Sequence, residues 1–319
     1  MERAAAEIVF DRVGKRYPGR GVPALSGLSL TVAAGELCVL VGPSGGGKTT
    51  ALKLVNRLVP FDEGDVRIDG RSVREIPPTE LRRGIGYVIQ QVGLFPHMTV
   101  AENVGTVPRL LGWPRERIRA RVGELLELVG LDAGDGKRYP AALSGGQRQR
   151  VGLARALAAD PPILLMDEPF GAVDPIVRAH LQHELRRLHR EVGKTILFVT
   201  HDVDEAIGLG DRIAILGEGG VLAQCDTPDA ILAEPANDFV ERFVGEDRAL
   251  RRLALRRLDD VALEARNGLP DAPVVPGATT VRNALSLMLE TGARAVVVLG
   301  DDGAERGVLR LAQVQELLR

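Results

Sequence analysis

The sequence predicts an α/β fold with a largely parallel sheet, followed by a small α+β domain. From residue 7 to about 245, short β-type segments alternate with longer helical ones, which is typical of α/β proteins. Three of these segments, 37–41, 163–167 and 195–200, are nearly continuous in apolar residues, as expected of strands buried on both faces. The stretch 259–319 has a compact β-α-β-β-α order, which indicates a separate domain.

The other elements follow from hydrophobic periodicity. Strands of an antiparallel layer are predicted over 8–10 and 28–32, and helices over 49–58, 147–159 and 178–191. In the last helix, one face carries apolar residues at helical spacing and should be buried: Leu181, Leu185, Leu188 and Val192. In the tail, strands are predicted over 274–275, 295–299 and 307–311, and helices over 280–290 and 312–318.

Composition narrows the class of protein. Of the 319 residues, 45% are hydrophobic and 26% charged, the balance of a soluble globular protein. The net charge of −2 gives no reason to expect a nucleic-acid partner, because nucleic-acid binders usually carry a basic excess. No apolar run reaches the ~18–20 residues that cross a bilayer, and the first residues lack the apolar core of a signal peptide. We therefore expect a cytoplasmic protein that meets a membrane only through a partner.

A basic segment, 246–258, lies before the tail and holds five arginines interleaved with leucines. One interpretation is an amphipathic helix on an anionic membrane surface. The other is a connecting helix with a solvated basic face, which we favour because the segment is short and has no aromatic anchors. The predicted domains are therefore a large α/β domain over 1–245, a basic linker helix over 246–258 and a small domain over 259–319.

A phosphate-binding loop joins the strand 37–41 to the helix that follows. It has the pattern G-x-x-x-x-G-K-[ST], with the residues Gly42, Pro43, Ser44, Gly45, Gly46, Gly47, Lys48 and Thr49, followed by Thr50. Glycines let successive backbone N–H groups point at phosphate oxygens, and the helix adds its positive dipole end. Lys48 is expected to reach the β- and γ-phosphates and Thr49 to ligate Mg²⁺. The Lys-Thr ending excludes a dinucleotide fingerprint, so the loop predicts ATP and Mg²⁺ as ligands.

Two carboxylates end the apolar strand 163–167. Asp167 is expected to hold the Mg²⁺ shell, which completes a P-loop nucleotide site. Glu168 should point to the other side of the strand end, where it can polarise an attacking water. Together with the phosphate loop, this pair predicts a P-loop NTPase.

A third motif, Leu143-Ser144-Gly145-Gly146-Gln147, precedes a long helix and offers amides and a hydroxyl to an anion. With these motifs in order, residues 7–245 resemble the nucleotide-binding subunit of ABC transporters, which have a mixed core sheet, an antiparallel β layer and a helical subdomain. The resemblance implies that this motif meets the γ-phosphate bound on a second copy, in a head-to-tail homodimer. It also implies roles for four single residues: adenine stacking by Tyr17, an Mg²⁺ link to the membrane subunits by Gln90, the aspartate loop at Asp174 and γ-phosphate contact by His201.

Three stretches, 87–97, 167–176 and 237–245, resemble the ATPase subunits of glycine betaine, carnitine and choline importers. The tail 259–319 resembles a single CBS module, the kind of domain that this subfamily carries there. Arg310 and Gln313 replace the hydroxyl residue and the aspartate of the CBS pattern, which favours pairing with the copy in the other subunit over nucleotide sensing.

The resemblance implies integral-membrane permease subunits and an extracytoplasmic solute-binding protein as partners. The chain is then expected at the cytoplasmic face of the inner membrane, peripheral through the permease. One alternative is an importer of another small polar solute, because the solute is inferred from resemblance alone. A soluble ABC ATPase that works on nucleic acid usually has a coiled-coil insertion or two cassettes, and this sequence shows neither.

Overall fold

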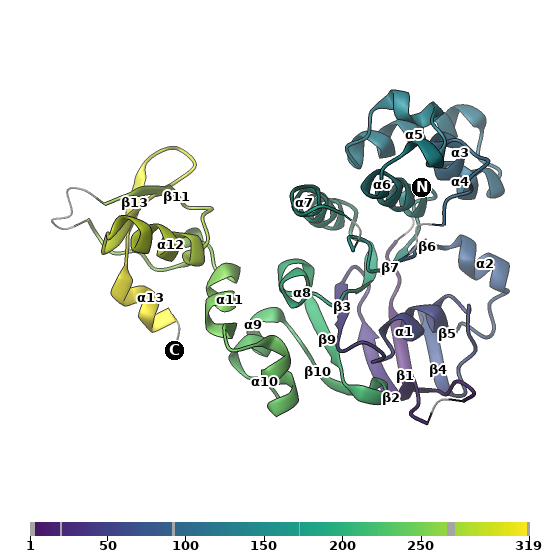
Figure 1. Cartoon of the computed structure of the whole chain (residues 1–319), viewed down its shortest axis with the longest axis horizontal. Coiled ribbons are helices and arrows are strands. Elements are labelled where there is room, and N and C mark those ends of the chain that lie inside the picture. Colours follow the sequence, from purple (N-terminus) through teal and green to yellow (C-terminus); the bar gives the residue numbers. More distant parts are fainter. Residues whose placement is uncertain (1–3, 20, 91–92, 172, 267–271, 318–319) are drawn as a thin grey trace. The chain divides into compact units, whose positions relative to one another are not determined.

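The computed structural model describes residues 4–19, 21–90, 93–171, 173–266 and 272–317, without the side chains of 188 and 192. The chain divides into two compact units, 1–225 and 226–319, and Figure 1 labels the elements of each. The domain limits predicted at 245 and 258 come from the resemblance of the sequence to a known family, and they stay a prediction. Among the described residues no helix is long and apolar enough to cross a membrane.

The first unit is built on a six-stranded sheet with the order β10-β9-β3-β8-β7-β6. The six strands are β3 (Leu37–Val41), β6 (Ile85–Val88), β7 (Ile163–Asp167), β8 (Thr195–Val199), β9 (Arg212–Leu216) and β10 (Leu222–Asp226). The pairs β3–β8, β3–β9, β6–β7 and β7–β8 are parallel, and every residue of β3, β7 and β8 is buried. The predicted parallel sheet and its three buried strands are therefore confirmed.

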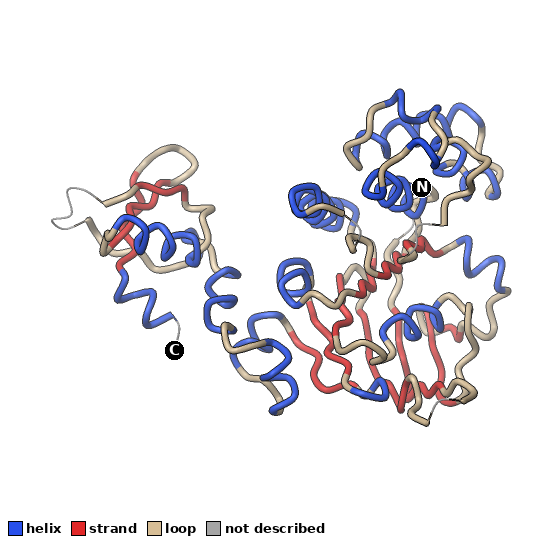
Figure 2. The backbone as a smooth tube through the Cα atoms, viewed as in Figure 1, coloured by secondary structure: helices blue, strands red, loops and turns tan. Residues whose placement is uncertain are grey.

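A second, antiparallel sheet has the order β2-β1-β4-β5. Its strands are β1 (Ile8–Lys15), β2 (Leu25–Val32), β4 (Glu63–Ile68) and β5 (Arg71–Ser72). The helix α1 (Lys48–Val55) contacts strands of both sheets, and one apolar core, which includes Phe10, Leu40 and Leu52, joins the three layers. Figure 2 shows α1 beside the red strands. The layer was predicted correctly, but both of its first strands are longer than expected.

Helices surround these sheets. They are α2 (Pro78–Arg83), α3 (Val100–Val104), α4 (Thr106–Leu110), α5 (Arg115–Leu128), α6 (Gly145–Leu157), α7 (Pro175–Val192) and α8 (Val203–Leu209). Helices α3 to α6 group together, and α6 packs on β6 (Figure 1). Helices α6 and α7 begin earlier than predicted, because Ser144 and Asp174 act as their N-caps. Pro175 then occupies the first helical position, where its missing N–H costs nothing. Leu181 and Leu185 on α7 are buried, as predicted.

The second unit begins with α9 (Pro228–Ala233), α10 (Asp238–Val244) and α11 (Arg248–Leu255). After them come β11 (Val274–Pro276), α12 (Val281–Thr291), β12 (Ala295–Leu299), β13 (Glu305–Arg310) and α13 (Leu311–Leu317). The sheet order is β11-β12-β13, with a parallel pair followed by an antiparallel one, so the predicted β-α-β-β-α order is confirmed.

Helix α11 lies inside the predicted basic linker. Leu253 is fully buried in the apolar core of the C-terminal unit. Three of its arginines form ion pairs with acids of the same unit: Arg248 with Glu241, Arg251 with Asp247 and Arg252 with Asp229. Leu250 of the same helix is 44% exposed, so only part of its apolar side is buried. Because Leu253 is buried and three arginines are engaged in ion pairs, the structure favours a packed connecting helix over a membrane-surface helix.

Candidate active site

The phosphate-binding loop runs from the end of β3 into α1, and two glycines make its path possible. Gly42 has φ 150° and Gly47 has φ 81°, conformations that side-chain-bearing residues rarely adopt. A Cβ at Gly42 would lie 2.1 Å from the carbonyl oxygen of Leu216, and one at Gly47 would lie 2.1 Å from that of Ala24. Gly47 is the N-cap of α1 and has no side chain to bond the first amides of the helix, which are left to face an anion.

Lys48 lies under this loop and is almost fully buried. Its ammonium donates hydrogen bonds to the carbonyl oxygens of Gly42 at 2.8 Å and Pro43 at 2.9 Å. Burial lowers the pKa of Lys48, while the carboxylates of Glu168 and Asp167 oppose that shift. The ammonium is therefore held by the loop at the place where phosphate oxygens would enter.

Thr49 and Asp167 bring a hydroxyl and a carboxylate together. The Thr49 hydroxyl donates to Asp167 Oδ1 at 2.9 Å, and Asp167 is only 4% exposed. Burial raises the pKa of Asp167, and the bond from Thr49 opposes this. Among the described residues Asp167 has no ion-pair partner, and buried carboxylates are normally paired or bind metal. A hydroxyl beside a buried carboxylate that forms no ion pair with the described residues is an oxygen donor set that fits Mg²⁺.

Glu168 follows β7 in a left-handed backbone conformation, with φ 46°. Such conformations cost about 1–3 kcal/mol in residues other than glycine and concentrate at functional sites. The Glu168 amide donates to the carbonyl oxygen of Val199 at 2.9 Å, which fixes this turn against β8. Because Glu168 lies just beyond the last residue of β7, this turn sets the direction of its side chain.

The carboxylate of Glu168 is bound on both oxygens. Gln90 Nε2 donates to Oε2 at 2.8 Å, and His201 Nδ1 lies 3.2 Å from Oε1. The three side chains come from the ends of three adjacent strands, β6, β7 and β8, because parallel strands end at the same edge of a sheet. The structure thus joins the candidate catalytic pair, Glu168 and His201, with Gln90.

These groups line one cavity of about 750 Å³. Its lining residues are Tyr17, Ala24, Ser44, Gly45, Gly46, Gly47, Lys48, Thr49, Thr50, Lys53, Gln90, Glu168 and His201. Two of them, Ala24 and Lys53, were not predicted. Lys53 lies one helical turn after Thr49 on α1, so helical spacing could have identified it. Ala24 has no sequence signal, because it reaches the loop only through the fold.

Eight predicted residues do not line this cavity: Gly42, Pro43, Ser144, Gly145, Gly146, Gln147, Asp167 and Asp174. Gly42 and Pro43 accept hydrogen bonds from Lys48, and Asp167 accepts one from Thr49, so these three adjoin the cavity through residues that line it. Ser144 and Gln147 form a capping box at the start of α6: the Ser144 hydroxyl accepts from the Gln147 amide at 3.2 Å, and the Gln147 side chain accepts from the Ser144 amide at 3.0 Å. Asp174 caps α7 by accepting from the amide of Val177 at 3.0 Å. Both helix starts are exposed at Ser144 and Asp174, so they are accessible to another molecule.

Comparisons with known proteins agree with this geometry. A sequence model of the ABC transporter family matches residues 25–171. The chain is 47% identical to the osmoprotectant import ATP-binding protein OsmV of Salmonella typhimurium, over 92% of this chain and 75% of that protein. It is 46% identical to the glycine betaine/carnitine/choline transport ATP-binding protein OpuCA of Bacillus subtilis, over 96% of this chain and 79% of that protein.

A solved structure of the dimeric ATP-binding cassette MJ0796, in a post-hydrolysis state bound to ADP and phosphate, is also similar. It is 36% identical with a TM-score of 0.63, and the match covers 69% of this chain and 98% of that one.

Proposed function

The chain belongs to the family of ABC transporter ATP-binding subunits, and we propose that it hydrolyses ATP to drive import of a quaternary-amine osmoprotectant such as glycine betaine, choline or carnitine. The observation that carries the chemistry is the Glu168 carboxylate, held by Gln90 and His201 at the mouth of a phosphate-loop cavity. The choice of solute is supported by the similarity to OsmV and OpuCA.

ATP would bind with its phosphates in the loop 42–49. The first amides of α1 and the Lys48 ammonium would contact phosphate oxygens, and Tyr17, which lines the same cavity, would stack on adenine. Thr49, Asp167 and Gln90 would hold Mg²⁺, which when bound neutralises charge on the β- and γ-phosphates.

Glu168 is the proposed general base. Its carboxylate would accept a proton from the water that attacks the γ-phosphorus, and Gln90 and His201 fix its orientation through both oxygens. The His201 side chain is 67% exposed, so its other ring nitrogen is accessible to a γ-phosphate while Nδ1 stays beside Glu168. The left-handed turn at Glu168 presents the carboxylate to the cavity before ATP arrives, which reduces the reorganisation that the reaction needs.

A second copy would complete the site. The capped, exposed start of α6 offers Ser144, Gly145 and Gly146 to an anion, and no phosphate loop of the same chain meets it. We infer that the start of α6 contacts the γ-phosphate held by the partner copy in a head-to-tail dimer. Asp174 of the partner copy would lie nearby. The dimeric state of the similar cassette MJ0796 supports this arrangement. Permease subunits and an extracytoplasmic solute-binding protein would complete the importer, with this chain at the cytoplasmic face of the inner membrane.

The substitution Glu168→Gln tests the chemistry. An amide cannot take the proton of the attacking water, so ATP binding should persist while turnover falls by ~10²–10⁴-fold. Phosphate release and equilibrium ATP binding are measured on the same preparations. Glu80→Gln, an exposed carboxylate on α2, is the matched control and should keep full activity. A Glu168→Gln protein that retained more than about a tenth of the wild-type rate would show that Glu168 is not the general base.

Uptake by the reconstituted importer tests the solute. Labelled glycine betaine, choline and carnitine should each be taken up, or compete with one another, in an ATP-dependent manner. Uptake of an unrelated polar solute without competition by these amines would instead support the alternative importer.

A further inference from the structure

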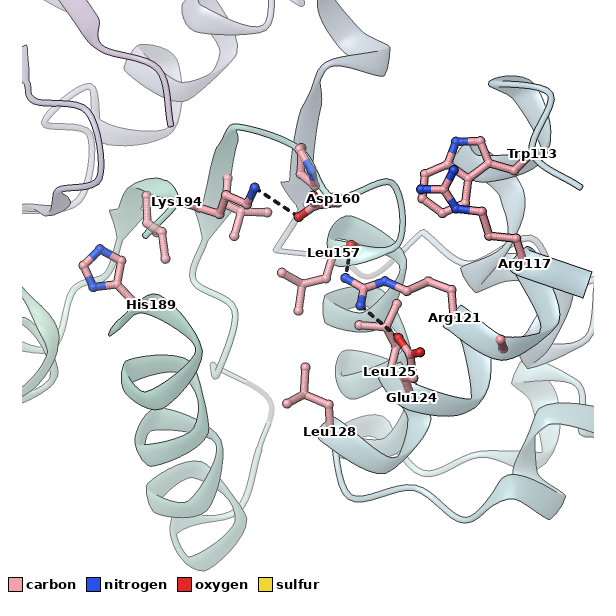
Figure 3. A pocket seen from close by; sticks show the side chains of 14 residues that line it. Trp113, Arg117, Arg121, Glu124, Leu125, Leu128, Leu157, Asp160, His189 and Lys194 are labelled. Carbon is pink, nitrogen blue, oxygen red and sulfur yellow. Dashed lines mark hydrogen bonds and ion pairs between the residues drawn. The ribbon is translucent and has the colours of Figure 1, made fainter. Parts of the chain in front are cut away.

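A second cavity of the first unit, about 460 Å³ in volume, shares no lining residue with the nucleotide cavity. It lies between α5, the end of α6 and the starts of β7 and β8 (Figure 3). Its apolar lining includes the half-buried Leu128 together with the buried Leu125 and Leu157. The volume lies in the range of ~300–1,000 Å³ that small-molecule sites occupy.

The polar groups of this cavity carry a net positive charge. Three cationic side chains face two carboxylates: Arg117, Arg121 and Lys194 against Glu124 and Asp160. Both carboxylates are already engaged, since Arg121 lies 3.1 Å from Glu124 and Lys194 lies 3.1 Å from Asp160. These two pairs are drawn as dashed lines in Figure 3. One positive charge is therefore left without a carboxylate in the cavity wall.

That charge belongs to Arg117, which has no ion pair within the part of the chain that the structure describes. Its guanidinium carbon lies 3.6 Å from the centre of the Trp113 ring, so the two planar groups are in contact, as Figure 3 shows. A guanidinium in this position keeps its N–H donors available for a planar anion such as a carboxylate.

From the flat Trp113–Arg117 pair, the uncompensated charge and the apolar lining, we propose that this cavity is a binding site for a planar aromatic carboxylate. The carboxylate meets Arg117 and the rings lie against Leu128, the half-buried leucine of the cavity wall. A neutral molecule of the same shape leaves the Arg117 charge unmatched, so the site discriminates by charge as well as by shape.

Trp113 is the only tryptophan of the chain, and it lines both this cavity and the neighbouring one that contains Arg119. Its fluorescence therefore reports a ligand in either cavity, and the substitutions described below distinguish the two. The full chain is titrated with 2-naphthoate and with the neutral isostere 2-naphthamide. We expect saturable quenching by 2-naphthoate and affinity at least about tenfold weaker for the amide, because a hydrogen bond to a charged group is lost. Saturating MgATP should leave the 2-naphthoate affinity unchanged, since the two cavities are separate.

Two substitutions and a control locate the ligand. Arg117→Gln should weaken 2-naphthoate binding by about tenfold, and Ala120→Phe, at an exposed position of the cavity rim, should block it. Arg119→Gln, on the same helix but lining a different cavity, should have no effect. Equal affinity for the acid and the amide, displacement by MgATP, or the same loss with Arg119→Gln as with Arg117→Gln would each overturn the proposal. Isothermal titration calorimetry repeats the comparison without relying on Trp113 emission.

Discussion

Asn103 holds the segment 95–99 in place, and its removal gives the sharpest test of how this region works. The side chain is fully buried on α3 and makes four hydrogen bonds to the backbone. Its Oδ1 accepts from the amide of Phe95 at 2.8 Å, and its Nδ2 donates to the carbonyl oxygens of Phe95, Met98 and Thr99 at 3.2, 3.1 and 3.0 Å. This segment lies in the stretch 91–105, which by resemblance to ABC transporters we expect to contact the permease; residues 91 and 92 lie outside the described residues.

Asn103→Ala removes all four bonds and leaves the backbone groups without their partner. The two N–H groups of Nδ2 are shared among three carbonyls, so the energy corresponds to about three bonds. At a net ~0.5–1.5 kcal/mol per hydrogen bond, the loss sums to about 1.5–4.5 kcal/mol, and we take about 3 kcal/mol. At about 2–4 °C per kcal/mol for a unit of this size, Tm should fall by about 6–12 °C. Solute uptake should fall more than basal ATPase activity, because the segment 95–99 is freed while the nucleotide cavity is untouched.

Differential scanning calorimetry, basal ATPase activity and reconstituted uptake measure the three effects. Thr106→Val is the matched control: its hydroxyl donates one bond, to the carbonyl oxygen of Glu102 at 2.9 Å, and its loss should cost about 1 kcal/mol or less. A drop in Tm of less than roughly 2 °C together with normal uptake would refute the role assigned to Asn103.

Three further predictions concern pH, coupling and the tail. Burial raises the pKa of Glu205, so the folded state keeps the Glu205 proton to higher pH than the unfolded state does. The Tm of the wild type should therefore fall relative to that of Glu205→Gln as pH rises above about 4.5. A Tm difference that stays constant across pH would contradict this. Phe95→Asp, at a side chain that is 41% exposed, should abolish uptake and spare basal ATPase activity, whereas equal loss of both would indicate a folding role. Deleting 259–319 should leave ATP hydrolysis intact but expose Leu253 and Leu258, which are buried in the core of the C-terminal unit. Light scattering should therefore show more aggregation than after deletion of 227–319, which removes these leucines as well. Inactive enzyme after either deletion would contradict the separation of the tail from the site.

Local pattern was enough to predict the α/β architecture and the phosphate loop. A strand buried on both faces is recognisable by its apolar run, and a loop that binds phosphate with backbone amides needs glycines at fixed spacing next to Lys48 and Thr49. The helix start at Ser144 can also be recognised from local sequence, because a capping box joins residues only three positions apart. The helix ends were less exact, since Asp174 and Pro175 begin α7 before the apolar periodicity does.

Only the tertiary structure could show which distant segments are in contact. Gln90 and Glu168 are 78 residues apart, and they meet only because β6 and β7 are neighbours in the sheet. The left-handed turn at Glu168 depends on a bond to β8, and the Trp113 cavity depends on how α5 packs beside β7 and β8. Periodicity in a sequence encodes which face of an element is buried, but it carries no information on which element covers that face. Most residues that line the nucleotide cavity could therefore be named from the sequence, but Ala24 could not, and the pairing of the residues had to come from the fold.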